Sequence, residues 1–187
     1  RRRLATQLAA AVPELGWSCC EALFMPLLLA LEVPTALLTL CWLFSPVLGL
    51  FLHPCVGALS DSWGRQPFLL LFGLLAAAGL VATPVCASRL SGNVAICATI
   101  AAYGLTDVSH DLLVTPTRAA MNDVFDAEQS EWRCAVVSGV GKLVGLLCAT
   151  FINSSQAFYA VAVLVLAAAC AQLAARDPGG CRGSQSA

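Results

Sequence analysis

The chain alternates between long apolar runs and short polar connections. Each of six runs is long enough to cross about 30 Å of hydrocarbon as a helix that rises 1.5 Å per residue. The runs cover residues 4–31, 34–59, 67–87, 93 to beyond 116, 134–152 and 157–175. Their apolar residues are continuous rather than alternating, which favours helices over the strands of a membrane barrel. The pattern predicts an all-α integral membrane protein, with a six-helix domain over residues 1–175 and a short tail at residues 176–187.

Arginines are distributed unevenly between the two ends of these predicted helices. An even number of spans places both termini on one side of the membrane. That side would carry Arg1, Arg2, Arg3, Arg65, Arg133, Arg176 and Arg182, with Arg118 near its boundary. The opposite side keeps Arg89. Because cytoplasmic loops are enriched in Lys and Arg, both termini are predicted to be cytoplasmic. The protein itself is expected in the plasma membrane or an intracellular vesicle membrane.

Composition agrees with a membrane location and excludes several classes of function. Hydrophobic residues make up 59% of the 187 residues and charged residues 11%, which is too apolar for a soluble domain. A net charge of -1 gives no electrostatic reason to expect nucleic acid as a partner. The cysteines show no metal-ligand spacing, so neither a metal nor a cofactor is predicted. Nucleotide-binding, serine-hydrolase and zinc-protease motifs are also missing, so we expect a transporter rather than an enzyme.

The fourth apolar run contains ionisable residues that share one helix face. Asp107, Asp111 and Arg118 are separated by four and seven residues, and both spacings are close to whole helical turns. A charge at the bilayer centre costs roughly 2.5–3.5 kcal/mol, so such residues normally face a polar cavity or one another. This arrangement predicts a translocation pathway. The alternative is an Asp–Arg pair that only fixes helix packing.

The connection between the second and third runs contains a second pattern. Gly57, Asp61, Gly64 and Arg65 resemble the motif of the major facilitator superfamily between helices 2 and 3. Gly57 would permit close helix approach, Asp61 would pair at a helix end, and Arg65 would anchor the cytoplasmic face. The alternative is that these polar side chains are simply solvated.

A narrower resemblance extends over about residues 14–150. Residues 42–54 (WLFSPVLGLFLHP) and 63–68 (WGRQPF) are similar to the sucrose/proton symporters of the glycoside–pentoside–hexuronide branch, which include the animal membrane-associated transporter proteins. Asp107, the run at residues 116–120 (PTRAA) and Asp123 occur at the spacing of those transporters. The glycine-rich run at residues 139–145 also matches.

This resemblance implies a fold and a set of roles. Members have twelve spans in two six-helix halves, so this chain corresponds to the N-terminal half, a three-plus-three bundle that is not expected to transport alone. The implied function is proton-coupled symport of a sucrose-like glycoside. Asp107 would couple protons and Arg118 would recognise the sugar. Asp111 is expected to share the proton, or else merely to face the cavity. Glu21, which aligns with a glutamate of the animal members, and Trp17 are candidate sugar-binding residues; the alternatives are an ion pair of Glu21 with Lys142 and a packing role for Trp17.

The expected partners are the lipid bilayer, a small sugar, protons, and a second six-helix half or another copy of the chain. A gene fragment or truncated isoform is consistent with the single half. The alternative function is a non-transporting, truncated or regulatory membrane scaffold, which would associate through the small-residue seam of Gly139, Gly141 and Gly145.

Three positions depart from the family pattern. Arg65 is followed by Gln66 where relatives have a run of arginines, His53 replaces a more usual glutamine, and Lys142 stands in the glycine-rich run. His53 is expected to be a satisfied core histidine, and the alternative is a histidine that exchanges a proton near neutral pH. Lys142 is expected to pair with Glu21 or Asp107, or to extend toward the membrane interface. An unpaired Lys142 at mid-depth against apolar side chains would instead favour a degenerate copy.

Overall fold

The computed structural model describes residues 2–175, apart from the side chains of Thr35, Ala36 and Phe44. Within this range the chain is all-helical, which confirms the predicted class. The helices are α1 (Arg2–Ala30), α2 (Thr35–Cys41), α3 (Phe44–Trp63), α4 (Arg65–Arg89), α5 (Gly92–Asn122), α6 (Ala127–Phe151) and α7 (Ser154–Ala174). The tail predicted at residues 176–187 lies outside the described residues.

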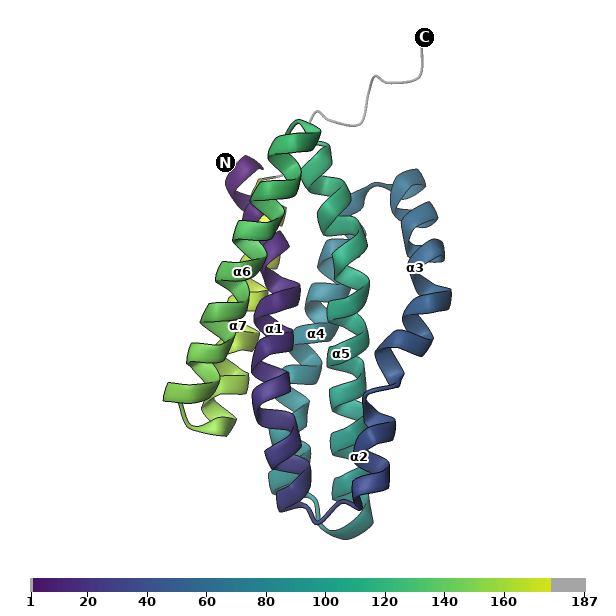
Figure 1. The fold of residues 1–187 in the computed structure, drawn as a ribbon, viewed down its shortest axis with the longest axis vertical. Helices are drawn as coiled ribbons and strands as arrows, with labels where there is room; N and C mark the ends of the chain where they lie inside the picture. The colour runs from purple at the N-terminus through teal and green to yellow at the C-terminus, as the bar shows by residue number, and fades with distance from the viewer. Residues whose placement is uncertain (1, 176–187) are drawn as a thin grey trace.

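The helices lie side by side in one elongated bundle (Figure 1). α2 and α3 together make one pass, so successive passes run in alternating directions. The α3–α4 and α5–α6 connections lie at the end that holds the N-terminus, and the α1–α2 and α4–α5 connections lie at the other end (Figure 1). At the N-terminal end, Gln172 of α7 donates a hydrogen bond to the Ala5 carbonyl at 2.7 Å. The start of α1 and the end of α7 therefore lie on the same side of the bundle.

Five helical segments in the described range are long and apolar enough to cross a membrane: Arg2–Ala30, Leu37–Trp63, Arg65–Arg89, Ala127–Phe151 and Ser154–Ala174. The sequence pattern predicts six. α5 is 31 residues long but is not among the five. It carries Asp107, Asp111 and Arg118, and these charges lower its apolar character. By length and composition the bundle therefore has five candidate spans and one polar helix.

The span predicted at residues 34–59 is present as the candidate segment Leu37–Trp63, but it is not one regular helix. The helical hydrogen-bonding pattern is interrupted at Trp42 and Leu43, between α2 and α3. Pro46 lies four residues after Trp42. Proline has no backbone N–H, and its ring clashes with the carbonyl four residues before it. The second pass is therefore made of two helices.

Two connections are shorter than the sequence pattern predicts. The loop expected at residues 60–66 is reduced to Gly64, whose φ of 89° favours glycine because it has no Cβ. The acidic stretch at residues 122–133 is helical from Ala127 onward. Asp126 occupies the N-cap position and Glu128 the first turn, where negative charge is favourable next to the helix dipole. Helical structure thus extends beyond the apolar run.

Close packing between α1 and α6 depends on two glycines of the glycine-rich run. A Cβ at Gly141 would collide with the Ala11 carbonyl, and a Cβ at Gly145 would collide with the Leu15 carbonyl and the Ser18 hydroxyl. Gly139 has no atom within 4 Å of such a Cβ. Two members of the proposed association seam are therefore used inside the chain, because small residues let helix backbones approach closely.

The contrast between Gly145 and Gly139 gives a matched test of this packing. Gly145→Ala should destabilise the protein by about 1–3 kcal/mol, because the added methyl group meets backbone atoms that cannot rotate away. Gly139→Ala should stabilise it by about 0.5–1 kcal/mol, because glycine within a helix is unfavourable relative to alanine. Thermal unfolding of both variants in detergent would measure the difference. Equal melting temperatures would contradict the α1–α6 contact.

Candidate functional site

A cavity of about 840 Å³ opens between four helices toward the N-terminal end of the bundle. Its lining side chains come from α1, α3, α5 and α6. The polar and charged ones are Glu14, Trp17, His53, Asp111, Thr117, Arg118, Asn122, Ser130, Glu131 and Ser138. The cavity thus combines acidic, basic and hydrogen-bonding groups, which suits a small polar solute.

Asp107 lies one turn from this cavity, within the protein. Asp107 is 6% exposed, and it is not among the residues that line the cavity. The Trp17 indole Nε1 donates a hydrogen bond to Asp107 Oδ1 at 3.0 Å. Trp17 does line the cavity. The indole therefore lies between the open cavity and the buried carboxyl group.

Asp111, one turn further along α5, is linked to α3. His53 Nε2 lies 3.0 Å from Asp111 Oδ2, and His53 Nδ1 lies 2.8 Å from the Thr115 hydroxyl. Gly49 makes room for this group, because a Cβ there would lie 2.5 Å from Asp111 Oδ2. His53 is therefore a polar partner of Asp111 at the cavity wall. Both of its ring nitrogens have partners, as expected, but its side chain is 32% exposed and does not lie in the core.

Arg118 does not pair with Asp107. The two side chains are separated by eleven positions, or about 16 Å at 1.5 Å per residue of helix. Over the described range, the ion pairs involve His53, Arg65 and their acidic partners, and none includes Arg118. Arg118 is exposed to the cavity. The predicted shared face is present, but the Asp–Arg pair is not.

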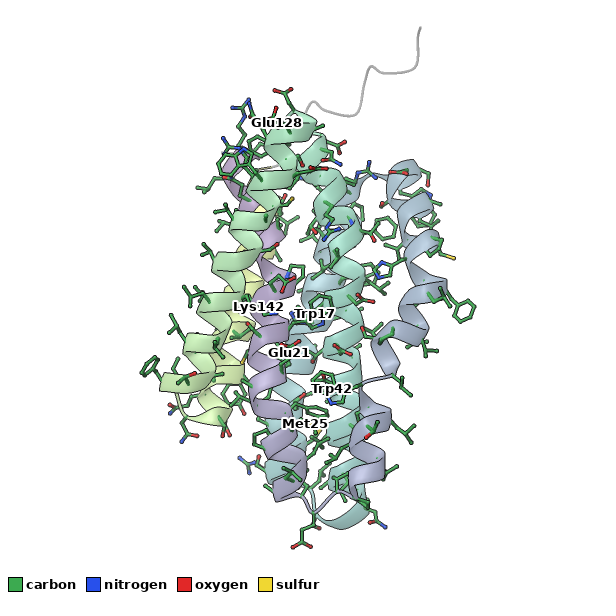
Figure 2. All side chains as sticks on the ribbon, in the orientation of Figure 1. Trp17, Glu21, Met25, Trp42, Glu128 and Lys142 are labelled. Carbon is green, nitrogen blue, oxygen red and sulfur yellow. The ribbon has the colours of Figure 1, made fainter. Side chains whose placement is uncertain are left out.

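Glu21 and Lys142 lie at the middle of the bundle, where Figure 2 shows them close to the level of Trp17. Both are exposed, and neither lines the cavity. Lys142 forms no ion pair with a carboxylate of residues 2–175, so the predicted pairing with Glu21 or Asp107 is wrong. Lys142 follows Ser138 by one helical turn, which places it beyond the cavity on the same side of α6.

A buried histidine also fixes the α1–α5 contact. His110 is fully buried, and its Nδ1 lies 2.8 Å from the Thr106 carbonyl, so Nδ1–H donates. A Cβ at Gly16 would collide with the His110 ring. His110 Nε2 has no hydrogen-bond partner in the described structure. This ring lies within the bundle rather than in the cavity.

The motif between the second and third passes forms an ionic clamp. Arg65 at the start of α4 contacts Asp61 of α3, and its Nε donates to Asp123 Oδ2 at 3.3 Å just after α5. Its guanidinium also donates to the Ser60 hydroxyl at 3.3 Å. Gly57 is not a tight contact, because a Cβ there would lie 3.7 Å from the Thr115 methyl group. The clamp joins three helices at one end of the bundle.

Sequence reasoning missed several partners in these sites. His53, Thr115 and Asp123 were not assigned to a site, although each makes a polar contact with a predicted site residue or its partner. The position of Asp123 in the family-like pattern was a signal for the clamp. No local pattern pointed to the His53–Asp111 contact, because 58 residues separate the two side chains.

Comparison with known proteins shows which transporters the chain is similar to. No protein-family model matches the chain. The chain is 33% identical over 140 residues to solute carrier family 45 member 4 of Mus musculus, covering 66% of this chain and 18% of that protein. It is 31% identical over 139 residues to the membrane-associated transporter protein of Homo sapiens, covering 65% of this chain and 26% of that protein.

A plant protein gives a similar match. The sucrose transport protein SUT3 of Oryza sativa subsp. indica is 31% identical over 141 residues, covering 65% of this chain and 28% of that protein. The chain thus spans roughly a fifth to a quarter of the length of the curated relatives it matches. These relatives are membrane transporters, and the resemblance found in the motifs is confirmed: the chain is similar to sugar transporters of the major facilitator superfamily.

Proposed function

We propose that the chain is the N-terminal six-helix half of a proton-coupled sugar symporter. A sucrose transport protein and the proton-associated sugar transporter A of Mus musculus, which is 31% identical over 124 residues, are among the relatives that support the substrate class. In this proposal α5 is the sixth span. Its charged face is acceptable in a membrane because it is covered by α1 and α3 or directed into the cavity.

The observation that carries the proposal is the buried Asp107 beside a polar cavity. A carboxyl group can hold or release a proton when its access to water changes, and that change is what couples a proton to a solute. Trp17 donates a hydrogen bond to the carboxyl group and lines the cavity, where a sugar ring can pack against it. Arg118 supplies up to five N–H donors for hydroxyl groups.

The proposal includes a second half as partner. In α6, the apolar residues Val136, Val140, Leu143 and Leu147 are exposed although they lie in a candidate span. A second bundle or lipid would cover them, and a second half would also close the cavity. We propose that both termini are cytoplasmic, because Arg2, Arg3, Arg65 and Arg133 lie toward the N-terminal end of the bundle.

Transport in proteoliposomes tests the proposal. The chain, assembled with a second half, should accumulate a labelled sucrose-like sugar when a proton gradient is imposed, and dissipating the gradient should stop accumulation. A non-transporting scaffold would bind its helical partners but show neither accumulation nor exchange. That result would reject the symporter.

A further inference from the structure

The His53–Asp111 pair lies at the cavity wall, one helical turn along α5 from Asp107. Asp107 does not line the cavity, whereas His53 and Asp111 both do. Asp111 and Asp107 are one turn apart on α5, and side chains at this spacing have Cβ atoms about 5–6 Å apart. Trp17 covers Asp107 on the α1 side. Along α5, Asp111 is therefore the cavity-lining acid next to Asp107, and His53 is its partner.

The hydrogen bonds of His53 permit it to gain and lose a proton without changing partners. Neutral imidazole donates from Nε2 to Asp111 Oδ2 and accepts at Nδ1 from the Thr115 hydroxyl. Protonated imidazole donates from both nitrogens, and the Thr115 hydroxyl rotates to accept. Because both charge states keep both contacts, the geometry favours proton passage over a fixed structural link.

We infer that His53 and Asp111 form a proton relay between the cavity and Asp107. This inference rests on the proposed symport. A proton from water binds imidazole at Nδ1 as the Thr115 hydroxyl turns to accept, and the Nε2 proton moves to Asp111 Oδ2, which leaves a neutral ring with its proton on Nδ1. The Asp111 proton then moves to the Asp107 carboxylate. The ring regains its starting form by giving the Nδ1 proton to water and taking a proton from water at Nε2, so that one proton taken from the cavity is delivered to Asp107.

Several other ionisable groups face the relay or its cavity. Those on α5 are Asp107 and Arg118, and the cavity adds Glu14 of α1 with Glu131 and Cys134 of α6. α4 carries no charged side chain between Arg65 and Arg89. None of these neighbours is within ion-pair distance of His53. Asp111 is its ion-pair partner among residues 2–175.

Trp17 provides a readout that needs no sugar. Its indole is bonded to Asp107, so its emission should change when Asp107 gains a proton. The other tryptophans, Trp42, Trp63 and Trp132, are exposed and can be replaced by Phe to leave Trp17 alone. The experiment follows the relaxation of Trp17 emission after a laser-triggered pH jump, with the chain in lipid nanodiscs.

His53→Gln should slow this relaxation by at least about tenfold, since a positioned acid–base group commonly contributes 10²-fold or more to proton transfer. Glutamine can still donate a hydrogen bond to Asp111, but its amide does not gain or lose a proton in this pH range. The matched control is Thr115→Val, which removes the contact at Nδ1, keeps a titratable imidazole, and should relax at close to the parental rate. Asp111→Asn should slow the relaxation to the same extent as His53→Gln. It tests the relay independently if the His53 variant does not fold.

The outcomes separate the relay from the transport proposal. Unchanged relaxation in both His53→Gln and Asp111→Asn would overturn the relay. A pH response of Trp17 that survives Asp107→Asn would also overturn it, because the signal would then not report proton arrival at Asp107. If the relay relaxation is observed but no sugar accumulates in proteoliposomes, the symporter assignment fails while the proton pathway stands.

A second readout excludes a merely structural role for His53. In the assembled transporter, the rate of proton-driven uptake by His53→Gln should be about tenfold lower than the parental rate. Between pH 5 and 8 it should also no longer change with pH as the parental rate does. Exchange of labelled for unlabelled sugar at equal concentrations should be retained. A parallel loss of uptake and exchange, with the pH profile unchanged, would assign His53 to packing and overturn the relay.

Discussion

Asp107→Asn is expected to abolish proton-driven accumulation of sugar. The substitution keeps the shape of the side chain, and the carbonyl oxygen of the new amide can still accept the hydrogen bond from Trp17 Nε1. An amide cannot carry the coupled proton. The change therefore separates coupling from packing at a site that is almost completely buried.

The size of the effect follows from the driving force. A gradient of one pH unit is worth about 1.4 kcal/mol per proton, which supports about tenfold accumulation for one proton per sugar. Without coupling, the internal sugar concentration should stop at the external concentration. The measurement is uptake of labelled sugar in proteoliposomes with and without the imposed gradient. The control is Asp126→Asn, since Asp126 is exposed between α5 and α6 and forms no side-chain cap.

Accumulation by Asp107→Asn at the parental level would show that Asp107 is not the coupling site. Retained exchange with lost accumulation would assign the residue to coupling alone. Loss of both would indicate that the carboxyl group also contacts the sugar.

The sequence was sufficient to predict the helical class and the polar face of α5. Both follow from local periodicity, because apolar runs of this length form helices and residues four or seven apart share a helix side. The same rigidity explains why the alternative, a packing pair of Asp107 with Arg118, is absent: residues on one face but three turns apart cannot meet. A shared face predicts a common environment, not a contact.

Side-chain partners from other helices could not be predicted in this way. Trp17 is 90 residues from Asp107, and His53 is 58 residues from Asp111. Their contacts depend on how α1 and α3 rotate and pack against α5, which in turn depends on glycines such as Gly49. A single sequence contains these glycines but does not say which atoms they admit.

The helix ends show a different limit. Apolar runs mark the part of a helix that lies in hydrocarbon, whereas the helix itself continues wherever backbone hydrogen bonds and charges favour it. α6 therefore begins at Ala127, before its apolar run, and α3 continues through Asp61 to Trp63. The interruption at Trp42 was visible in principle from Pro46, because the effect of proline on the preceding turn is local.

Arg118→Lys is expected to weaken sugar binding with little effect on coupling. Arg118 is exposed to the cavity and is not neutralised by an ion pair within residues 2–175. Its planar guanidinium can donate two parallel hydrogen bonds to neighbouring hydroxyl groups, whereas an ammonium group keeps the charge but loses this fork. Loss of one charge-assisted hydrogen bond is worth about 1.5–3 kcal/mol.

This energy corresponds to an increase in KM for sugar of roughly 10- to 100-fold. The ratio of internal to external sugar at equilibrium should stay at the parental value, because Asp107 and its Trp17 contact are about 16 Å away along α5. Arg89→Lys is the matched control, since Arg89 is exposed at the opposite end of the bundle and should leave KM unchanged. An unchanged KM in Arg118→Lys would remove Arg118 from the sugar site. A lower accumulation ratio at saturating sugar would instead place Arg118 in the proton pathway, despite its separation from Asp107.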